Sequence, residues 1–476
     1  MKVVRFQCLF SIAERIRTTK LLWQVALVIA WLVCRASPLA AQQDPNEGVA
    51  TPGAEEAAST VTGDYSGPAV LSRAMQPVIG GGEVDTIQPF FSLNRIYGTG
   101  LNGGLTGDAP AALQSGLDLG FGLKGTHRWK RTTLQIEYDG SYRDYTGTPD
   151  ANGLNQFFHA TAALQLKRHL LLSIRQTGGI LTQDTGSLLL QPEFLETSST
   201  LPTNEPFSEG LKLIDSLATL TYQKTQRLSF SASIDGSLVR QDSTSLIGTN
   251  NVIASADVRY LLNPRTAIGL DYSFSHFGYT TFGSTDVNGA AIDYSWRATK
   301  SIDVALQAGI SHSSTLGLAV VPLDPEVAAL LGETTAIQIS HQAANTPRMN
   351  ARVTKHWRRA SADLNYRRGI SPGNGLVLAS TEDSMTAGLH YTNPNRWTVS
   401  VEAGRSTMGQ LAGVASYTQT TFGTSFSRSI RPGVQAVGRF SVLPATYVGL
   451  QGLNRTYYRG EVGFIFSPNQ IPVALR

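Results

Sequence analysis

The chain has 476 residues, of which 41% are hydrophobic and 16% charged, and its formal net charge is +4. This length allows two or three soluble domains or one large barrel. The mean hydropathy of −0.08 excludes a protein built of membrane-spanning helices. The longest apolar run, Leu21–Val33, has thirteen residues, fewer than the roughly 20 that such a helix needs.

The N-terminal residues have the organisation of a secretory signal peptide. A basic stretch precedes the apolar run Leu21–Val33, and small residues from Ser37 to Ala41 follow it. We therefore expect a signal peptide at residues 1–41, with cleavage after Ala41. Cys34 is a poor lipidation site, because Val33 before it is bulkier than the small residue which that modification requires.

Removal of this signal changes the composition in two ways. Both cysteines, Cys8 and Cys34, leave with it, so the mature chain would hold no thiol, disulfide or cysteine metal site. The signal also takes six of the 39 Lys and Arg residues and one of the 35 Asp and Glu residues, which leaves 33 basic and 34 acidic residues. The pI of about 9.0 is therefore no sign of nucleic-acid binding.

Residues 42–86 are expected to form a flexible, acidic, periplasmic leader. They are rich in Ala, Gly, Thr, Glu and Pro, and they hold seven acidic residues against Arg73 as the one basic residue. Such a composition cannot bury enough apolar surface to fold. The segment is also too short for a plug domain.

From residue 87 to residue 466 the chain repeats a unit in which apolar and polar residues alternate. In Arg227–Leu238, Leu228, Phe230 and Ile234 fall on even positions, whereas the odd positions carry Ser and Asp. Successive side chains of a strand point to opposite faces, so each unit is a strand with one apolar and one polar face. Seventeen clear strands are predicted, near 111–124, 134–143, 157–167, 170–178, 213–223, 227–239, 251–261, 266–276, 287–297, 301–311, 348–357, 360–369, 384–391, 397–405, 416–428, 433–442 and 455–466.

Short and long connections alternate between these strands, as in bacterial barrels with short periplasmic turns and long external loops. The first clear strand leads into a short turn and therefore descends, so an ascending strand must precede it. Gln88–Ile96 is the candidate. The sequence thus predicts an all-β fold, a transmembrane antiparallel up-and-down β-barrel of about 18 strands, within a range of about 16–18.

Aromatic residues support this arrangement, because membrane barrels carry aromatic girdles at both interfaces. The predicted strand directions place outward aromatic residues at the periplasmic ends, namely Tyr222, Tyr260, Trp296, Trp357, Tyr391 and Trp397. They place others at the external ends, namely Tyr142, Phe274, Tyr366 and Phe440.

The pattern resembles Gram-negative outer-membrane β-barrel proteins, in particular porin-like single-chain barrels. The resemblance covers residues 87–466 and rests on architecture more than on a motif. Arg459–Phe466 is similar to the C-terminal strand that this family presents to the barrel-assembly machinery, and residues 467–476 follow it as a short tail. The resemblance implies an outer-membrane location, contact with outer-membrane lipids and lipopolysaccharide, and small hydrophilic solutes as permeants.

Motifs that suggest other chemistry have simpler explanations. Gly98–Gly103 has the spacing of a dinucleotide-binding loop, but a strand rather than a helix follows it. Ser275, Ser311 and Ser340 each precede a His, which a Ser-rich chain produces by chance, and a catalytic pair needs a third group that orients the base. We therefore predict no enzyme activity, no catalytic residue, no cofactor, no metal site and no nucleic-acid partner.

The polar faces of the strands would line the lumen. The candidate pore-lining residues are Asp118, Glu137, Asp139, Arg143, Arg175, Asp235, Asp257, Arg259, Asp271, Asp293, Arg352, Arg367, Glu402 and Arg439, and Asp303, Asp363, Arg459 and Glu461 share their face. A solvated wall with cross-strand ion pairs explains most of them. Because the signs are mixed, they predict neither strong anion nor strong cation selectivity.

Two long loops could narrow this lumen. The loop 179–212 contains a group of apolar residues that is unusual for a loop exposed to solvent. We predict that this loop folds into the lumen and narrows it with Leu188, Leu189, Leu190, Phe194 and Leu195. Packing over the mouth is the alternative. In the loop 312–347, residues 324–332 have the N-cap, the proline and the closing glycine of a short helix, which would act as a lid or an external cap.

The function expected from the sequence is a porin-like channel for small hydrophilic solutes. Two alternatives remain open: a barrel that serves a dedicated export system such as an exopolysaccharide conduit, and a closed barrel that acts as a surface adhesin or structural anchor. A TonB-type transporter is disfavoured because the leader cannot supply a plug. The sequence gives no basis for an oligomeric state.

Overall fold

The computed structural model describes residues 85–99, 113–146, 152–181, 210–242, 246–280, 283–322, 335–375, 377–393, 397–411, 415–448, 454–468 and 471–472. All of them belong to one compact unit, Ser59–Arg476. The predicted signal peptide and almost all of the predicted leader lie outside this part of the chain, so both stay predictions. Within the described ranges, no helix is long and apolar enough to cross a membrane.

The described residues form eighteen long strands and one short strand. Their bounds are β1 Asp85–Gly98, β2 Gln114–Arg128, β3 Thr132–Tyr145, β4 Gly153–Lys167, β5 Leu170–Leu181, β6 Leu211–Gln223, β7 Leu228–Gln241, β8 Thr249–Asn263, β9 Thr266–Tyr279, β10 Ser284–Thr299, β11 Ile302–Pro322, β12 Thr335–His356, β13 Ala360–Gly373, β14 Leu378–Asn393, β15 Trp397–Gln410, β16 Ser416–Arg431, β17 Val434–Val448, β18 Arg455–Phe466 and β19 Ile471–Pro472.

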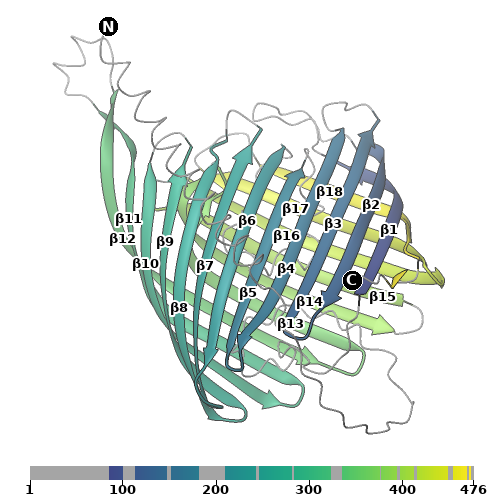
Figure 1. Cartoon of the computed structure of the whole chain (residues 1–476). Coiled ribbons are helices and arrows are strands. Elements are labelled where there is room, and N and C mark those ends of the chain that lie inside the picture. Colours follow the sequence, from purple (N-terminus) through teal and green to yellow (C-terminus); the bar gives the residue numbers. More distant parts are fainter. Residues whose placement is uncertain are drawn as a thin grey trace. The chain divides into compact units, whose positions relative to one another are not determined.

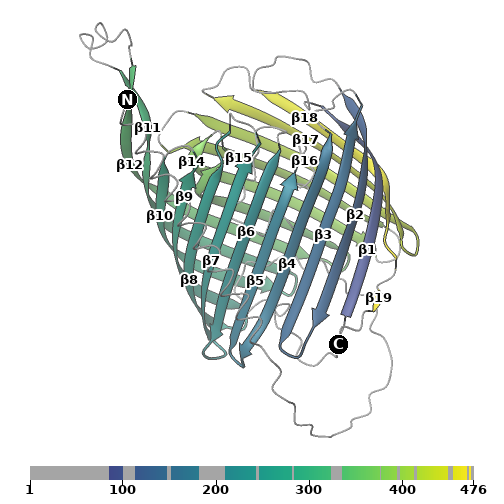
Figure 2. The same ribbon diagram turned by 45° about the horizontal axis from the view of Figure 1, so that its top comes forward.

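These strands make one closed antiparallel barrel (Figure 1). Each long strand pairs with its neighbours in the sequence, and β1 pairs with both β2 and β18. Phe91–Gly98 of β1 lie opposite Arg459–Phe466 of β18 at this closure, and Figure 2 shows the two strands side by side. The predicted all-β, up-and-down barrel of eighteen strands is confirmed, and the ascending strand expected at Gln88–Ile96 is β1.

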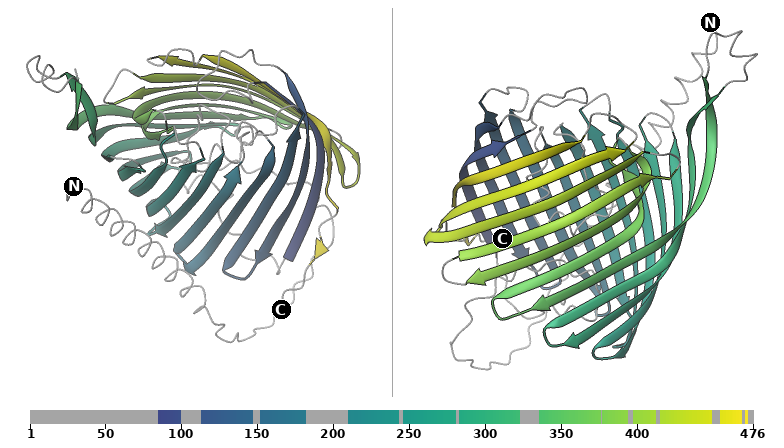
Figure 3. Two further views of the ribbon diagram at one scale, coloured as in Figure 1. Left: turned by 90° about the horizontal axis from the view of Figure 1, so that it is seen from above. Right: turned by 180° about the vertical axis from the view of Figure 1, so that it is seen from behind.

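The external ends of the strands extend further than the sequence pattern predicts. Most of the predicted loop 312–347 is wrong, because β11 and β12 continue as a paired hairpin from Ser311 opposite Thr346 to Pro322 opposite Thr335. This hairpin projects beyond the other strands (Figure 3). Backbone pairing thus continues beyond the segments in which the apolar–polar alternation is clear. The short helix predicted at 324–332 lies outside the described residues.

The outer surface of the barrel is an apolar belt. Leu270 on β9, Ile292 on β10 and Val462 on β18 are each more than 60% exposed and point away from the barrel. Trp296 and Tyr260 lie near the ends of β10 and β8 that carry short turns, which we call the periplasmic ends. A continuous apolar surface of this size does not face water in soluble proteins, so the barrel spans a membrane.

Glycines allow close approach at two places in the barrel. Phe90 of β1 lies opposite Gly122 of β2, and its ring occupies the space in which a Cβ atom of Gly122 would stand, 2.1 Å from Phe90 Cζ. Gly433, in the turn between β16 and β17, has a φ of 77°, and a Cβ there would lie 2.7 Å from the Ser467 carbonyl oxygen. Both close contacts lie beside the seam that β1 and β18 close.

We predict that Leu270→Arg lowers the stability of the barrel in lipid by about 2–4 kcal/mol, because it places a charge on the lipid-facing surface. Leu270 is 63% exposed and lies between Val258 and Ile292 in the register. Denaturant unfolding in vesicles measures the change. Gln135→Arg, on the inward face of β3, is the matched control and should cost little; equal losses in the two variants would contradict a lipid-facing belt.

Candidate functional site

The inward face of the barrel is the candidate functional site. On β8, Val252 and Val258 are exposed on the outside, whereas Asp257 and Arg259 lie on the opposite face of the same strand. The same alternation places all fourteen candidate residues on inward positions of their strands, where directly paired neighbours share a face.

The largest charge network lies across β8 to β12. Arg348 Nη1 is 2.8 Å from Asp271 Oδ1, and it donates a hydrogen bond to Ser273 Oγ at 2.7 Å. Arg348 on β12 and Asp271 on β9 belong to one register row, in which Gly309 and Ala291 stand between them. These two small residues leave room for the arginine side chain to lie across two strands and reach the carboxylate.

Further carboxylates share this network. Arg259 Nε lies 3.3 Å from Asp257 Oδ2, and Arg259 Nη2 lies 4.0 Å from Asp293 Oδ2. Asp257 faces Asp271 directly across the β8–β9 pair, a position in which like charges repel. Arg259 and Arg348 offset this repulsion, so the network holds three carboxylates with two guanidinium groups.

A second group lies on β5, β6 and β7. Arg175 Nη2 is 3.7 Å from Asp215 Oδ2, and the side chain of Asp215 is 1% exposed. Asp235, 7% exposed, interacts with both residues. Isolated charges are very costly to bury, and the contact between Arg175 and Asp215 reduces that cost.

Other ion pairs join neighbouring strands around the barrel. Each consists of a basic and an acidic residue that lie directly opposite each other on the inward face, namely Arg143–Asp118 at 2.7 Å, Lys124–Glu137, and Arg439–Glu461 at 3.7 Å. Asp139 lies opposite Phe157. The pairs hold opposite charges at fixed positions along the wall.

The wall between β12 and β16 has a more open distribution of charge. His390 Nε2 lies 3.5 Å from Asp363 Oδ1, and Arg352 also acts on Asp363 electrostatically. Arg367 faces Asn350 and Ser384 in the register and has no ion pair within the described ranges. Glu402 lies between Gly388 and Gly423, with small neighbours on both sides.

Hydroxyl groups fill the space between the charges. One register row crosses six strands, from β7 to β12, and its members are Ser233, Ser255, Ser273, Gly289, Ser311 and Thr346. Ser233 Oγ and Ser255 Oγ are 2.7 Å apart and hydrogen-bonded. Hydroxyls both donate and accept, so this wall offers a permeant the same kinds of hydrogen bond as water.

At the external end, two connections reach across the barrel and meet. Ile247, between β7 and β8, donates its backbone N–H to the carbonyl of Gly375, between β13 and β14, at 3.0 Å. Ala379 donates its N–H to the hydroxyl of Tyr279 on β9 at 2.9 Å. Because β7 and β13 are six strands apart in the sheet order, these bonds cross the interior. We call residues 246–248, 373–375 and 377–379 the mouth bridge.

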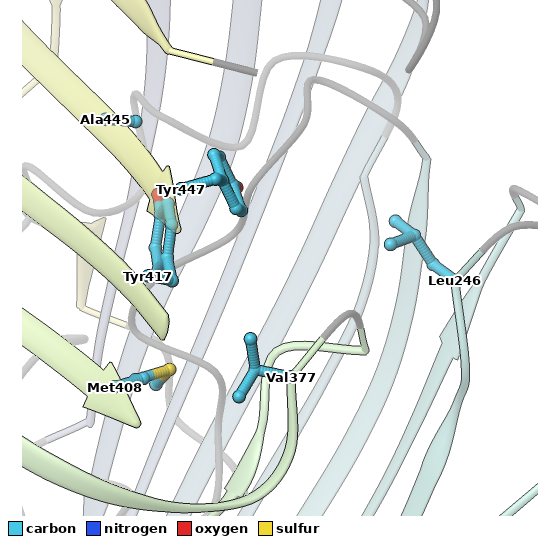
Figure 4. Close-up of a cluster of buried hydrophobic side chains, with 6 residues drawn as sticks. All are labelled: Leu246, Val377, Met408, Tyr417, Ala445 and Tyr447. Atoms are coloured by element: carbon cyan, nitrogen blue, oxygen red, sulfur yellow. The ribbon is translucent and has the colours of Figure 1, made fainter. Parts of the chain in front are cut away.

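An apolar cluster packs the mouth bridge against the inner face of β15, β16 and β17 (Figure 4). Leu246 and Val377 from the bridge pack with Met408 on β15, Tyr417 on β16 and Tyr447 on β17. Val377, Met408 and Tyr417 are each 1% exposed, and the rings of Tyr417 and Tyr447 are 4.5 Å apart. A continuous line of apolar contacts therefore runs from the β7–β8 connection to β17.

Several of these residues escaped sequence reasoning. Asp215 was missed because Leu213 and Leu217 share its inward face, so β6 has no polar face to recognise. The sequence does contain a signal for the mouth bridge, because the apolar run at 376–378 lies in a loop that is predicted to face water. The predicted constriction loop, with Leu188, Leu189, Leu190, Phe194 and Leu195, lies outside the described residues and stays a prediction.

The Ser–His neighbours do not form catalytic pairs where the structure describes their side chains. Ser275 is buried on the inward face of β9 and His276 is exposed on the outward face, and Ser311 and His312 are divided in the same way on β11. His276 instead contacts Asp286 at 2.6 Å on the outer surface. Among the described residues, no group of three or more His, Cys, Asp or Glu side chains is arranged to hold a metal ion.

The chain is similar in fold to solved barrels of Pseudomonas. Pseudomonas aeruginosa OpdQ is 12% identical, with 81% of this chain and 97% of that chain covered and a TM-score of 0.38. The P. aeruginosa outer membrane protein OpdK is 10% identical over 80% and 99%, with a TM-score of 0.41. A BenF-like porin from Pseudomonas fluorescens Pf-5 is 10% identical over 80% and 98%, with a TM-score of 0.39.

No family model matches this chain, and no curated protein matches it.

We predict that Arg348→Met shifts the selectivity of the barrel toward cations several-fold, because it leaves Asp257, Asp271 and Asp293 with Arg259 alone. The reversal potential under a salt gradient measures the shift. Arg368→Met is the matched control, since Arg368 lies on the outward face with Asp383, 3.7 Å away. An equal shift in both variants would rule out a specific role for the network.

Proposed function

We propose that this protein is a porin-like channel that carries small hydrophilic solutes across the outer membrane of a Gram-negative bacterium. The observation that carries the proposal is the division between the two faces of one closed sheet. The outer face is apolar, whereas the inner face holds paired charges and hydroxyls on nearly every strand. Barrels of 16–18 strands are wide enough for an aqueous lumen, and such an inner face suits water and dissolved solutes.

The fourteen candidate residues would line this pore, together with Lys124, Asp215 and Arg348. Their fixed ion pairs support weak selectivity by charge, because each local field is offset by a neighbour of opposite sign. The network with three carboxylates on β8 to β10 would favour cations locally. Arg352 and Arg367, on the neighbouring strands β12 and β13, would favour anions.

The partners implied by this function follow from the same surfaces. The apolar belt would contact outer-membrane lipids and lipopolysaccharide, and β18, with outward Val462, Phe464 and Phe466, would be presented to the assembly machinery.

The projecting β11–β12 hairpin supports a second candidate function, attachment at the cell surface. Shortening the hairpin separates the two, since attachment should fall while conductance stays.

We expect the purified barrel to give nanosiemens-scale steps in a planar bilayer and to admit small sugars in vesicle-swelling assays, with rates that fall as solute size rises. Heat-denatured protein is the control for leakage. A barrel that stays silent in both assays, in the wild type and in variants with a weakened mouth bridge, would contradict the channel function.

A further inference from the structure

We propose that the mouth bridge is a gate, which closes the external end of the lumen through an apolar seal and opens when the bond between Ala379 and Tyr279 is released. The inference rests on the proposed channel function and adds its regulation. Two connections that are far apart in the sheet, β7–β8 and β13–β14, supply the moving parts. The inner face of β15–β17 is the fixed surface against which these connections close.

The seal is apolar, whereas the charge network on β8 to β12 and the row of hydroxyls beside it are polar. Val377 lies between Leu246 on one side and Met408 on the other, and Tyr417 and Tyr447 lie on the same side as Met408 (Figure 4). An apolar constriction blocks ions and polar solutes by excluding water, even where the atoms themselves leave a narrow passage. The seal therefore separates the charged wall below it from the outside.

The bond between Ala379 and Tyr279 holds a strained segment in place. Ala379 has a φ of 38°, a conformation that residues other than glycine seldom adopt. Its N–H donates to the hydroxyl of Tyr279, and its carbonyl accepts from the N–H of Leu411. Strain of this kind persists only where the surroundings over-determine it. Removal of one bond should therefore let the segment relax away from the closed position.

Two glycines allow the tight backbone of this turn in the closed position. Gly373 and Gly375 have φ values of 89° and 85°. A Cβ on Gly373 would lie 1.8 Å from the carbonyl oxygen of Val377, so the closed turn requires glycine there. The turn is ordered internally by the side chain of Asn374, which accepts from the N–H of Val377 at 3.0 Å. It can thus swing as a unit about its junctions with β13 and β14.

The test measures access to a thiol below the gate. Residues 42–476 contain no cysteine, so Ser255→Cys supplies a unique inward site at mid-height of β8. Tyr279→Phe removes the hydroxyl that Ala379 contacts, and Val377→Ser makes the seal polar. Tyr272→Phe is the matched control, because Tyr272 lies on the outward face of the same strand and donates to Asn288 at 2.9 Å.

Each variant also carries Ser255→Cys. Intact cells that express it are treated with a membrane-impermeant charged maleimide, and the rate of labelling is measured. The single-channel current of each purified variant is recorded separately. Any route to the thiol through the periplasm is the same in the control. Resistance to unfolding in detergent before heating shows that each barrel is intact.

We expect Tyr279→Phe and Val377→Ser to raise both the labelling rate and the open probability several-fold over Tyr272→Phe. Equal labelling in all three variants would overturn the gate, whether or not the barrel conducts. Faster labelling without current in any variant would support the gate and contradict the channel function.

Discussion

Every backbone N–H and C=O group within a membrane must find its partner inside the protein, because lipid offers none. For a sheet this condition is met only by closure, and the pairing of β1 with β18 supplies it. That pairing uses the first and the last long strand of the barrel, so the sheet loses its free edges only when the whole chain is in place. Beside this seam, Gly122 leaves room for the ring of Phe90, and Gly433 lets its turn approach the backbone carbonyl of Ser467.

Once the sheet is closed, the two-residue period of a strand divides the chain into two environments. The outward positions need only be apolar. The inward positions carry charged side chains, and these must be placed so that they do not destabilise the barrel. The barrel meets this second demand by pairing across strands. Arg348 reaches Asp271 only because Gly309 and Ala291 leave the intervening surface low. The position of Arg348 therefore depends on small residues one and two strands away.

The external mouth follows different rules from the wall. Beyond the membrane, some strands continue as paired hairpins, as β11 and β12 do. Elsewhere the chain turns inward because its apolar side chains pack against the opposite wall, as Val377 does. The inward turn brings Ala379 into a strained conformation between Tyr279 and Leu411. Strained backbone gathers at functional positions in proteins, and in this barrel it lies at the entrance to the polar lumen.

The sequence alone determined the wall. Alternation as clear as that of Arg227–Leu238 identifies the strands, the connection lengths give their directions, and parity assigns Asp257 and Arg259 to one face and Val258 to the other. Local periodicity is enough for this, because each strand faces lipid on one side along its length. Where that contrast is weak, so is the pattern: Asp215 stands among inward leucines, and β11 and β12 stay paired beyond the segments with clear alternation. Only the tertiary structure decided that Arg348 reaches Asp271 and that Ile247 meets Gly375, because those contacts join residues whose distance depends on how the whole sheet curves and closes.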